Sequence, residues 1–343
     1  MMNRYDPLGG GFLRLGRRDA GEQVCRLWWS GSGVRTKVCC DRLEAEFAVP
    51  EADTHTPWVA VTVDGTPVAR IPLAPGRRRY DLLGRLGAEA AHEVAIVRDS
   101  QPSDADSGPL ELLAIYTDGV PEAPAPRGRL IEFVGDSLTV GEGTLGPESA
   151  MEWRMALISN QFAYPTLVSE RLDAEKRVIA LGGWGAHVSF DINYSHTLGH
   201  IYDSLCAVVP GGEAAYDFEA QMPADAVVIN LGTNDFSGLN KVHTPPTGEQ
   251  LAAFTASAEA LLAQLRRRNP GAVLLWAYGL CGNGLEEPIK RAVEARRAAG
   301  DGKVSFLALT DCGNDHGSRS HPSRRAHRRA AKEIAAALEE LLH

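Results

Sequence analysis

Three features are scarce in this sequence: basic charge, long apolar runs and paired cysteine motifs. The 343 residues carry 35 basic against 44 acidic side chains, a formal net charge of −9. A protein that binds nucleic acid without sequence preference needs a basic surface, and this chain has no excess of basic charge to build one. The composition therefore predicts no nucleic-acid partner and favours small or uncharged ligands.

Apolar runs are short as well. The longest, Ala272 to Tyr278, has seven residues, whereas a membrane-spanning helix needs about 20. Glycines and arginines interrupt the first thirty residues, so they contain no apolar core of a signal peptide. The six cysteines follow no CxxC spacing, which favours free thiols in a reducing compartment. We expect no membrane partner and a cytoplasmic location, with secretion possible if a leader has been removed.

What remains is the composition of a folded globular protein, with 44% apolar and 23% charged residues. The length predicts about two domains. In the first region, the strand-like runs Trp58–Val63 and Thr66–Ile71 flank Asp64-Gly65, a pair typical of a tight hairpin turn. Several short strands at such spacing predict a β-sandwich of the jelly-roll kind over residues 1–120.

A connector with three prolines, residues 121–128, follows this region. Over residues 129–343, short apolar runs then alternate with helical patterns. This alternation predicts a parallel sheet with helices on both faces, a three-layer α/β/α domain. The apolar runs are Leu130–Val134, Arg177–Leu181, Ala226–Asn230, Val273–Trp276 and Val304–Leu307, and the helical patterns are Asn160–Leu172, Glu249–Arg268, Leu285–Ala299 and Ser323–Leu342. Because ligands of such sheets bind at the carboxyl ends of the strands, the loops after the runs are the candidates for chemistry.

The loop after the first run is Gly135-Asp136-Ser137-Leu138. A serine at a strand-to-helix turn presents its hydroxyl at the sheet edge, and the helix N-terminus supplies positive potential that suits a developing oxyanion. Asp and Ser are also ordinary helix caps. The tetrapeptide alone therefore does not separate a nucleophile from a cap.

Two further loops carry groups of the kind that acyl transfer needs. Gly232-Thr233-Asn234-Asp235 follows the third run, and a side-chain amide there either donates to an oxyanion or forms a turn. His321-Pro322 precedes the last helix, where the proline holds the histidine extended beside a helix N-terminus. Singly, each of these patterns is common.

Taken in order, these loops resemble the SGNH hydrolases, also called the GDSL esterase family. The matching blocks are Gly135-Asp136-Ser137-Leu138, Gly182-Gly183-Trp184-Gly185, Gly232-Thr233-Asn234-Asp235 and His321-Pro322. The amino-terminal β-domain, the stretch Trp28-Trp29-Ser30-Gly31-Ser32-Gly33 and the segment from Asp136 to Gly143 are similar to carbohydrate esterase family 2. That family joins a jelly roll to an SGNH domain and removes acetyl groups from sugars.

The resemblance implies a flavodoxin-like α/β/α hydrolase domain over residues 129–343. It implies a serine esterase that removes O-acetyl groups from xylan-, mannan- or oligosaccharide-type substrates through an acyl-enzyme. Ser137 would be the nucleophile and His321 the base, while the N–H groups of Ser137 and Gly183 and the amide of Asn234 would form the oxyanion hole. No cofactor and no metal are implied, and the oligomeric state is left open. An SGNH esterase for lipid or aryl esters and a non-catalytic glycan-binding protein are the alternatives.

One position departs from the family pattern. SGNH enzymes usually carry an aspartate three residues before the histidine, or in some relatives two, and here Ser318 and Arg319 occupy these positions. We expect a Ser137–His321 dyad in which a backbone carbonyl accepts the imidazole N–H, and a slower rather than an inactive enzyme. Asp315 and Asp311, further upstream, remain the alternative partners.

The segment between the second and third blocks is rich in aromatic residues and suits a lid or a sugar platform. Trp184, inside the second block, is the candidate for stacking on a sugar ring. Asp235 is a candidate for binding a sugar hydroxyl, or equally for capping a turn. The pattern G-x-G-x-x-G at residues 141–146 lacks the strand-turn-helix context of a dinucleotide site. His196 and His200 have a helical metal spacing without a third ligand nearby, so we expect no metal site.

Overall fold

The computed structural model describes residues 1–19, 21–51, 55–84, 86–87 and 89–343. It divides into two compact units that are discontinuous in sequence. The first comprises Met1–Arg127, Arg154–Ala156 and Ser204–Asp217, and the second comprises Gly128–Trp153, Leu157–Asp203 and Phe218–His343.

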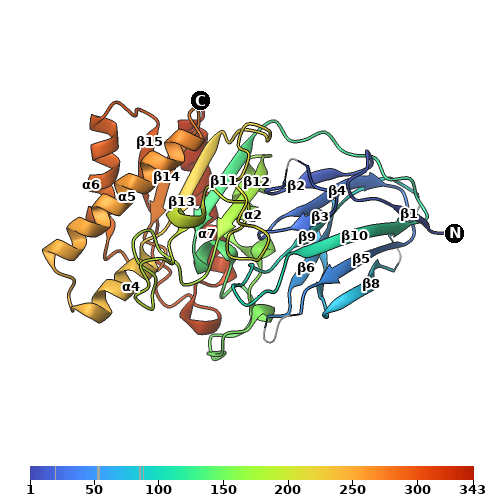
Figure 1. Ribbon diagram of the computed structural model, residues 1–343, viewed down its shortest axis with the longest axis horizontal. Helices are drawn as coiled ribbons and strands as arrows, with labels where there is room; N and C mark the ends of the chain where they lie inside the picture. The colour runs from blue at the N-terminus through green and yellow to red at the C-terminus, as the bar shows by residue number, and fades with distance from the viewer. Residues whose placement is uncertain (20, 52–54, 85, 88) are drawn as a thin grey trace. The chain divides into compact units, whose positions relative to one another are not determined.

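The first unit is built from antiparallel strands (Figure 1). One sheet has the order β1-β10-β5-β8, with β3 also pairing with β10, and the other has the order β2-β4-β9-β6-β7. The strands are β1 (Asn3–Tyr5), β2 (Leu13–Leu15), β3 (Cys25–Leu27), β4 (Gly33–Val38), β5 (Leu43–Val49), β6 (Trp58–Val63), β7 (Thr66–Pro72), β8 (Gly76–Leu83), β9 (His92–Arg98) and β10 (Leu110–Thr117).

The predicted hairpin is present as β6 and β7. Asp64 and Gly65 join these strands with φ of 48° and 78°, the left-handed values of the tight turn that this residue pair favours. Phe47 and Leu112 of one sheet share a single apolar core with Val61 and Ile96 of the other. Two sheets that bury their inner faces together form a β-sandwich, which confirms the predicted fold of this region.

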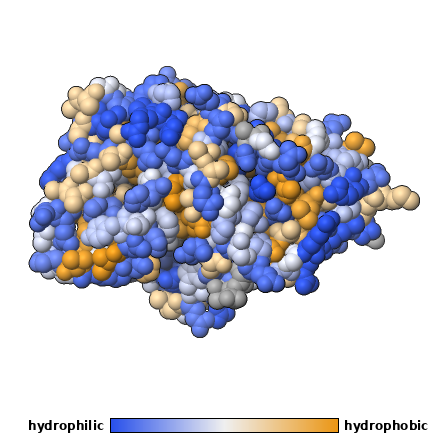
Figure 2. Space-filling view, viewed as in Figure 1, coloured by the Kyte–Doolittle hydropathy of each residue, from blue (hydrophilic) through white to orange (hydrophobic). Residues whose placement is uncertain are grey.

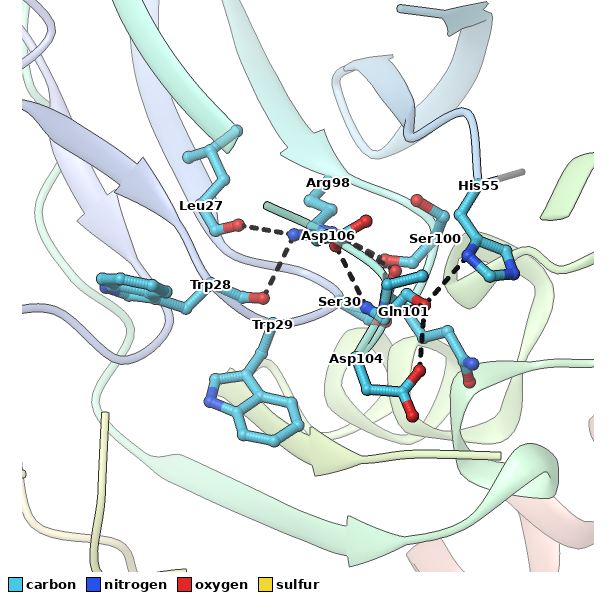
Figure 3. Close-up of polar contacts among 12 residues, drawn as sticks. Leu27, Trp28, Trp29, Ser30, His55, Arg98, Ser100, Gln101, Asp104 and Asp106 are labelled. Carbon is cyan, nitrogen blue, oxygen red and sulfur yellow. Dashed lines mark hydrogen bonds and ion pairs between the residues drawn. The ribbon is translucent and has the colours of Figure 1, made fainter. Parts of the chain in front are cut away.

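The loop after β3 is fixed by a buried arginine (Figure 3). Arg98, at the end of β9, donates to the carbonyls of Leu27 at 3.1 Å, Trp28 at 3.3 Å and Gln101 at 2.8 Å. Its guanidinium also lies 3.2 Å from Asp106 Oδ2, which pairs the buried charge. Trp28 is itself fully buried. The Trp-Trp-Ser-Gly stretch therefore begins in the buried interior of this unit.

The second unit contains a parallel sheet of order β12-β11-β13-β14-β15. Its strands are β11 (Leu130–Gly135), β12 (Glu175–Ala180), β13 (Ala226–Asn230), β14 (Val273–Tyr278) and β15 (Val304–Ala308). The five predicted runs each form one of these strands. The order of the sheet is the flavodoxin-like one: β12 lies on one side of β11 and the later strands on the other, so the strand order reverses between β11 and β13. The predicted α/β fold class is confirmed.

Helices connect these strands. They are α1 (Ser137–Val140), α2 (Tyr164–Arg171), α3 (Leu198–Ile201), α4 (Thr233–Val242), α5 (Gly248–Arg268), α6 (Glu286–Ala298) and α7 (Arg324–Leu341), with single 3₁₀ turns at Met155–Leu157, Asn160–Phe162 and Ser318–Ser320. Helix α2 packs on α7, and α5 packs on α6 (Figure 1). Right-handed crossovers on either side of β11 place the two pairs on opposite faces of the sheet.

No helix in the described part of the chain is long and apolar enough to cross a bilayer. On the face drawn in Figure 2, hydrophilic residues predominate and hydrophobic ones form separate patches among them. Such a mixture is ordinary for a protein surface.

Candidate active site

Ser137 stands at the end of the first strand of the parallel sheet. Strand β11 ends at Gly135, and Asp136 caps α1 by accepting the N–H of Leu138 at 3.0 Å. A Cβ at Gly135 would collide with the Thr139 side chain, so this sharp turn requires glycine. Ser137 is the first helical residue, with 7% of its surface exposed. Its N–H has no acceptor among the described residues and belongs to the unbonded donors of a helix N-terminus.

His321 lies directly against Ser137. Its Nε2 is 2.9 Å from Ser137 Oγ, and its Nδ1 is 2.9 Å from the carbonyl oxygen of Arg319. A carbonyl only accepts, so Nδ1 carries the proton and Nε2 is left as the acceptor for the serine hydroxyl. This is the tautomer that a general base needs.

The aspartates left open as partners of His321 are engaged elsewhere. Asp315 accepts the Ser323 hydroxyl at 2.5 Å and pairs with Arg325 at 2.9 Å, and the Arg325 guanidinium lowers the pKa of this carboxyl. Asp311 accepts the backbone N–H groups of Gly282 and Gly313, each at 2.6 Å. The Nδ1 partner is therefore the Arg319 carbonyl.

The loop of His321 approaches the loop of Ser137 very closely. Gly143 has φ of +86°, and a Cβ on it would lie 2.6 Å from the Cβ of His321. Ser318 Oγ donates to the carbonyl of Leu145 at 3.1 Å, and the N–H of Arg319 donates to Ala150 at 2.9 Å. These bonds fix the position of the His321 imidazole relative to the Ser137 hydroxyl.

Asn234 joins the loops that follow β11, β12 and β13. It lies in the first turn of α4, and its Nδ2 donates to Asp136 Oδ2 at 3.1 Å and to the carbonyl of Trp184 at 2.9 Å. Both amide hydrogens are thereby oriented. The N–H of Gly183, after β12, has no acceptor in the described part of the chain, and so resembles that of Ser137.

The bond from Asn234 to Asp136 had no signal in the sequence. Asp136 is fully buried, and this burial raises the pKa of its carboxyl to about 7, although the Leu138 N–H opposes the shift. The nearby carboxylates of Asp235 and Glu142 raise the pKa further. Because the two bonded residues are 98 positions apart, only the folded chain shows that Asp136 orients the amide.

Asp136 is expected to make stability depend on pH. A carboxyl with a pKa of 3.8 when exposed and about 7 when folded holds its proton more tightly in the native state. Its contribution to the free energy of unfolding is complete below about pH 4 and is lost as the pH rises through about 7. Asp136→Asn keeps one of the two acceptor oxygens and carries no titration. Urea unfolding should therefore show a shallower decline between about pH 4 and pH 7 for this variant than for the wild type. Glu340→Gln, an exposed position on α7, is the control. If the free energy of unfolding declined equally with pH in all three proteins, Asp136 would not be a buried titrating group.

Asp235 corrects a sequence prediction. Its carboxylate is fully buried and accepts the backbone N–H groups of Ala186 at 3.0 Å, His187 at 2.6 Å and Val188 at 3.0 Å. Burial raises the pKa of this carboxyl, and the three N–H bonds oppose the rise. A side chain with no exposed surface does not reach a sugar hydroxyl. Asp235 instead accepts hydrogen bonds from the backbone of the loop after the second block, which corresponds to the alternative role of capping a turn.

Trp184 is half-buried and stacks on His196, with ring centroids 4.8 Å apart and an interplanar angle of 4°. Further along the same excursion, Phe190, Ile192 and Tyr194 are exposed. Tyr194 packs edge-on against His187 at 5.2 Å. The segment that follows the second block therefore exposes aromatic and apolar side chains at the surface of this unit.

No group of three or more His, Cys, Asp or Glu side chains within the described ranges is placed to hold a metal ion. His196 stacks on Trp184, and His200 Nδ1 lies 3.0 Å from the Thr197 hydroxyl and 3.1 Å from the Ser195 carbonyl. The groups gathered at the carboxyl ends of β11, β12 and β13 are a serine, a histidine and candidate oxyanion donors, an arrangement suited to acyl transfer.

Two curated proteins are similar to most of this chain. Cellulase/esterase CelE of Acetivibrio thermocellus is 27% identical over 92% of this chain and 37% of its own length. An acetylxylan esterase / glucomannan deacetylase of Cellvibrio japonicus is 30% identical over 66% of this chain and 64% of its own length. The chain thus spans about a third and just under two thirds of these relatives.

A solved structure agrees along nearly the whole chain. The acetyl xylan esterase Est2A from the rumen bacterium Butyrivibrio proteoclasticus superposes with a TM-score of 0.94 at 27% identity, covering 99% of this chain and 98% of that one. The model of the GDSL-like lipase/acylhydrolase family matches residues 133–341, and that of the carbohydrate esterase 2 N-terminal region matches residues 14–126. The resemblance drawn from the residues is confirmed. The chain belongs to the GDSL-like lipase/acylhydrolase family, and an N-terminal region of the carbohydrate esterase 2 type precedes the family's domain in the same chain.

Proposed function

We propose that this protein is a serine esterase that removes O-acetyl groups from carbohydrates. The observation that carries the proposal is the pair of contacts made by His321, 2.9 Å from Nε2 to Ser137 Oγ and 2.9 Å from Nδ1 to the Arg319 carbonyl. The first contact gives the serine a base, and the second fixes the tautomer in which Nε2 accepts.

The reaction follows from this geometry in two halves. Ser137 Oγ forms a bond to the ester carbonyl carbon while its proton passes to His321 Nε2. The oxyanion that develops faces the N–H groups of Ser137 and Gly183 and the amide of Asn234. As the C–O bond to the sugar breaks, the imidazolium returns the proton to the leaving alcohol. Water then attacks the acetyl-enzyme, His321 takes its proton, and acetate leaves as Ser137 Oγ is reprotonated.

Several observations support a sugar as the leaving group. The two curated relatives are named as a cellulase/esterase and as an acetylxylan esterase / glucomannan deacetylase. Trp184 lies within the block that supplies Gly183, and Phe190 and Tyr194 expose aromatic surface on the same segment. An aromatic ring offers a broad apolar face with few internal degrees of freedom, which suits the apolar face of a sugar ring.

The test compares substrates and one variant. Wild type and Ser137→Ala are assayed on acetylated xylo- and manno-oligosaccharides, on an aryl acetate and on aryl esters of longer acids. We expect acetate release from the oligosaccharides that Ser137→Ala abolishes, and lower rates as the acyl chain lengthens. A preference for long acyl chains would favour a lipid or aryl esterase. Oligosaccharide binding without serine-dependent hydrolysis of any ester would favour a glycan-binding protein and overturn the proposal.

A further inference from the structure

A buried carboxylate that the reaction above does not use lies against the dyad. Glu142 follows the C-terminal glycine of α1, and its side chain is 5% exposed. Its Oε2 is 3.6 Å from His321 Nε2, and its Oε1 is 2.6 Å from the Arg319 guanidinium. An acidic side chain is rarely buried without a partner, and here the partner is the residue whose carbonyl orients the histidine.

Arg319 has an unusual backbone conformation. Its φ and ψ are 54° and 35°, in the left-handed region that residues other than glycine seldom adopt. This conformation directs its carbonyl to His321 Nδ1, two residues further along the chain. Such strain persists only where the surroundings enforce it. The N–H bond to Ala150 and the ion pair with Glu142 restrain Arg319 from its backbone and from its side chain.

We propose that Glu142 is a positioning residue of the Ser137–His321 dyad, and this rests on the proposed esterase function. Through its ion pair, Glu142 holds Arg319 in the conformation that presents the carbonyl to Nδ1. Its second oxygen faces Nε2, the atom that takes the serine proton. A carboxylate there stabilises the imidazolium that forms, which is the service that the absent aspartate gives in a triad.

The other titratable groups near the dyad come from α7, from the N-cap of α1 and from the 3₁₀ turn before α7. His327 of α7 is fully buried, and burial lowers its pKa to about 3, so this imidazole stays neutral at working pH. Asp136, before the nucleophile, has a pKa of about 7 because of burial. Arg319 supplies a fixed positive charge. Glu142 is thus the carboxylate in direct reach of His321 Nε2.

The test is Glu142→Gln, which keeps the shape and removes the charge. Steady-state kinetics on an aryl acetate are expected to give a kcat about tenfold lower, with KM within about twofold. The pH profile of kcat/KM is expected to differ from that of the wild type, because the substitution removes a negative charge 3.6 Å from His321 Nε2. NMR spectra of the histidine side chains at one fixed pH should show the His321 ring signals displaced in Glu142→Gln, whether or not the protein is active. Glu148→Gln, an exposed carboxyl in the same loop, is the matched control.

A pair of variants at Arg319 tests the restraint itself. Glycine adopts positive φ freely, so Arg319→Gly can leave the carbonyl in place without its side chain. Arg319→Ala loses the ion pair and keeps the strain, and is expected to lower kcat several-fold more than Arg319→Gly. Melting temperatures of all the variants separate unfolding from misalignment.

The inference and the esterase function fail in different ways. If Glu142→Gln leaves kcat and the His321 ring signals as in wild type, or lowers only the melting temperature, the positioning role is wrong while Ser137-dependent hydrolysis stands. If wild type shows no Ser137-dependent hydrolysis, the esterase function fails. In that case unchanged His321 ring signals in Glu142→Gln would refute the contact on their own.

Discussion

Replacing His321 by alanine is expected to lower kcat by about 10⁴-fold or more, whereas Asp315→Ala and Asp311→Ala are expected to stay within about twofold of wild type. The reason is the hydrogen-bond geometry. His321 Nε2 faces Ser137 Oγ at 2.9 Å and Nδ1 faces the Arg319 carbonyl. Asp315 is bound to Ser323 and Arg325, and Asp311 to two backbone N–H groups.

The measurement is kcat on an aryl acetate, which does not depend on sugar binding, for the three single variants and for Ser137→Ala with His321→Ala. Residues of one catalytic unit are not additive, so the double variant should be no slower than the slower single one. Circular dichroism checks that each variant is folded. An Asp315→Ala or Asp311→Ala protein as inactive as His321→Ala would replace the dyad by a triad.

A neutral carbonyl in place of the aspartate has a further consequence. It selects the tautomer as well as a carboxylate does, but it does little for the charge of the imidazolium. The expectation from the sequence, a slower enzyme rather than an inactive one, stays a prediction. The buried carboxylate of Glu142 on the Nε2 side restores part of the missing negative charge.

Much of the fold could be predicted because its signals are local. Each apolar run after the proline connector forms a strand, and Asp64-Gly65 forms the expected turn. Strand β8 gave no such signal, since it begins Gly-Arg-Arg-Arg and is largely exposed. It pairs with β5, and across this pairing Arg77 forms an ion pair with Glu46 and Arg79 one with Glu44. Helix α4 was missed because the polar residues of the third block conceal its start.

The residues of the site likewise divide into those that local patterns predict and those that depend on long-range contacts. Ser137, Gly183, Asn234 and His321 follow strand ends or precede a helix, so their order along the chain indicates their meeting place. The roles of Asp136 and Glu142 depend on contacts with residues 98 and 177 positions away, which no local pattern encodes. The left-handed conformation of an arginine is equally invisible, because glycine is the usual residue there. The sequence leaves Asp235 open between a sugar ligand and a turn cap, because the burial that decides between the two roles is a tertiary property.

Asn234→Ala is expected to lower kcat by about 100- to 1000-fold with little change in KM, the usual cost of one lost oxyanion donor. Wild type, Asn234→Ala and Asn234→Asp are compared on an aryl acetate, and Asn240→Ala, on the same helix, is the control. Asn234→Asp keeps the shape but removes the donors and brings a second carboxyl to Asp136. It should therefore be no more active than the alanine variant. A kcat for Asn234→Ala within about threefold of wild type would exclude the amide from the oxyanion hole.

The size of this effect depends on what the amide does before substrate arrives. Its two hydrogens are held by Asp136 Oδ2 at 3.1 Å and by the Trp184 carbonyl at 2.9 Å, so donation to an oxyanion requires one of them to be shared. The developing oxyanion competes well for the hydrogen held by the Trp184 carbonyl, because a hydrogen bond to a full negative charge is about twice as strong as one to a neutral acceptor. The amide is thus oriented in advance by two bonds and gives part of one to the oxyanion only when charge develops there. An interaction that strengthens only in the transition state raises kcat and leaves KM unchanged, which is why the loss on Asn234→Ala should appear in kcat.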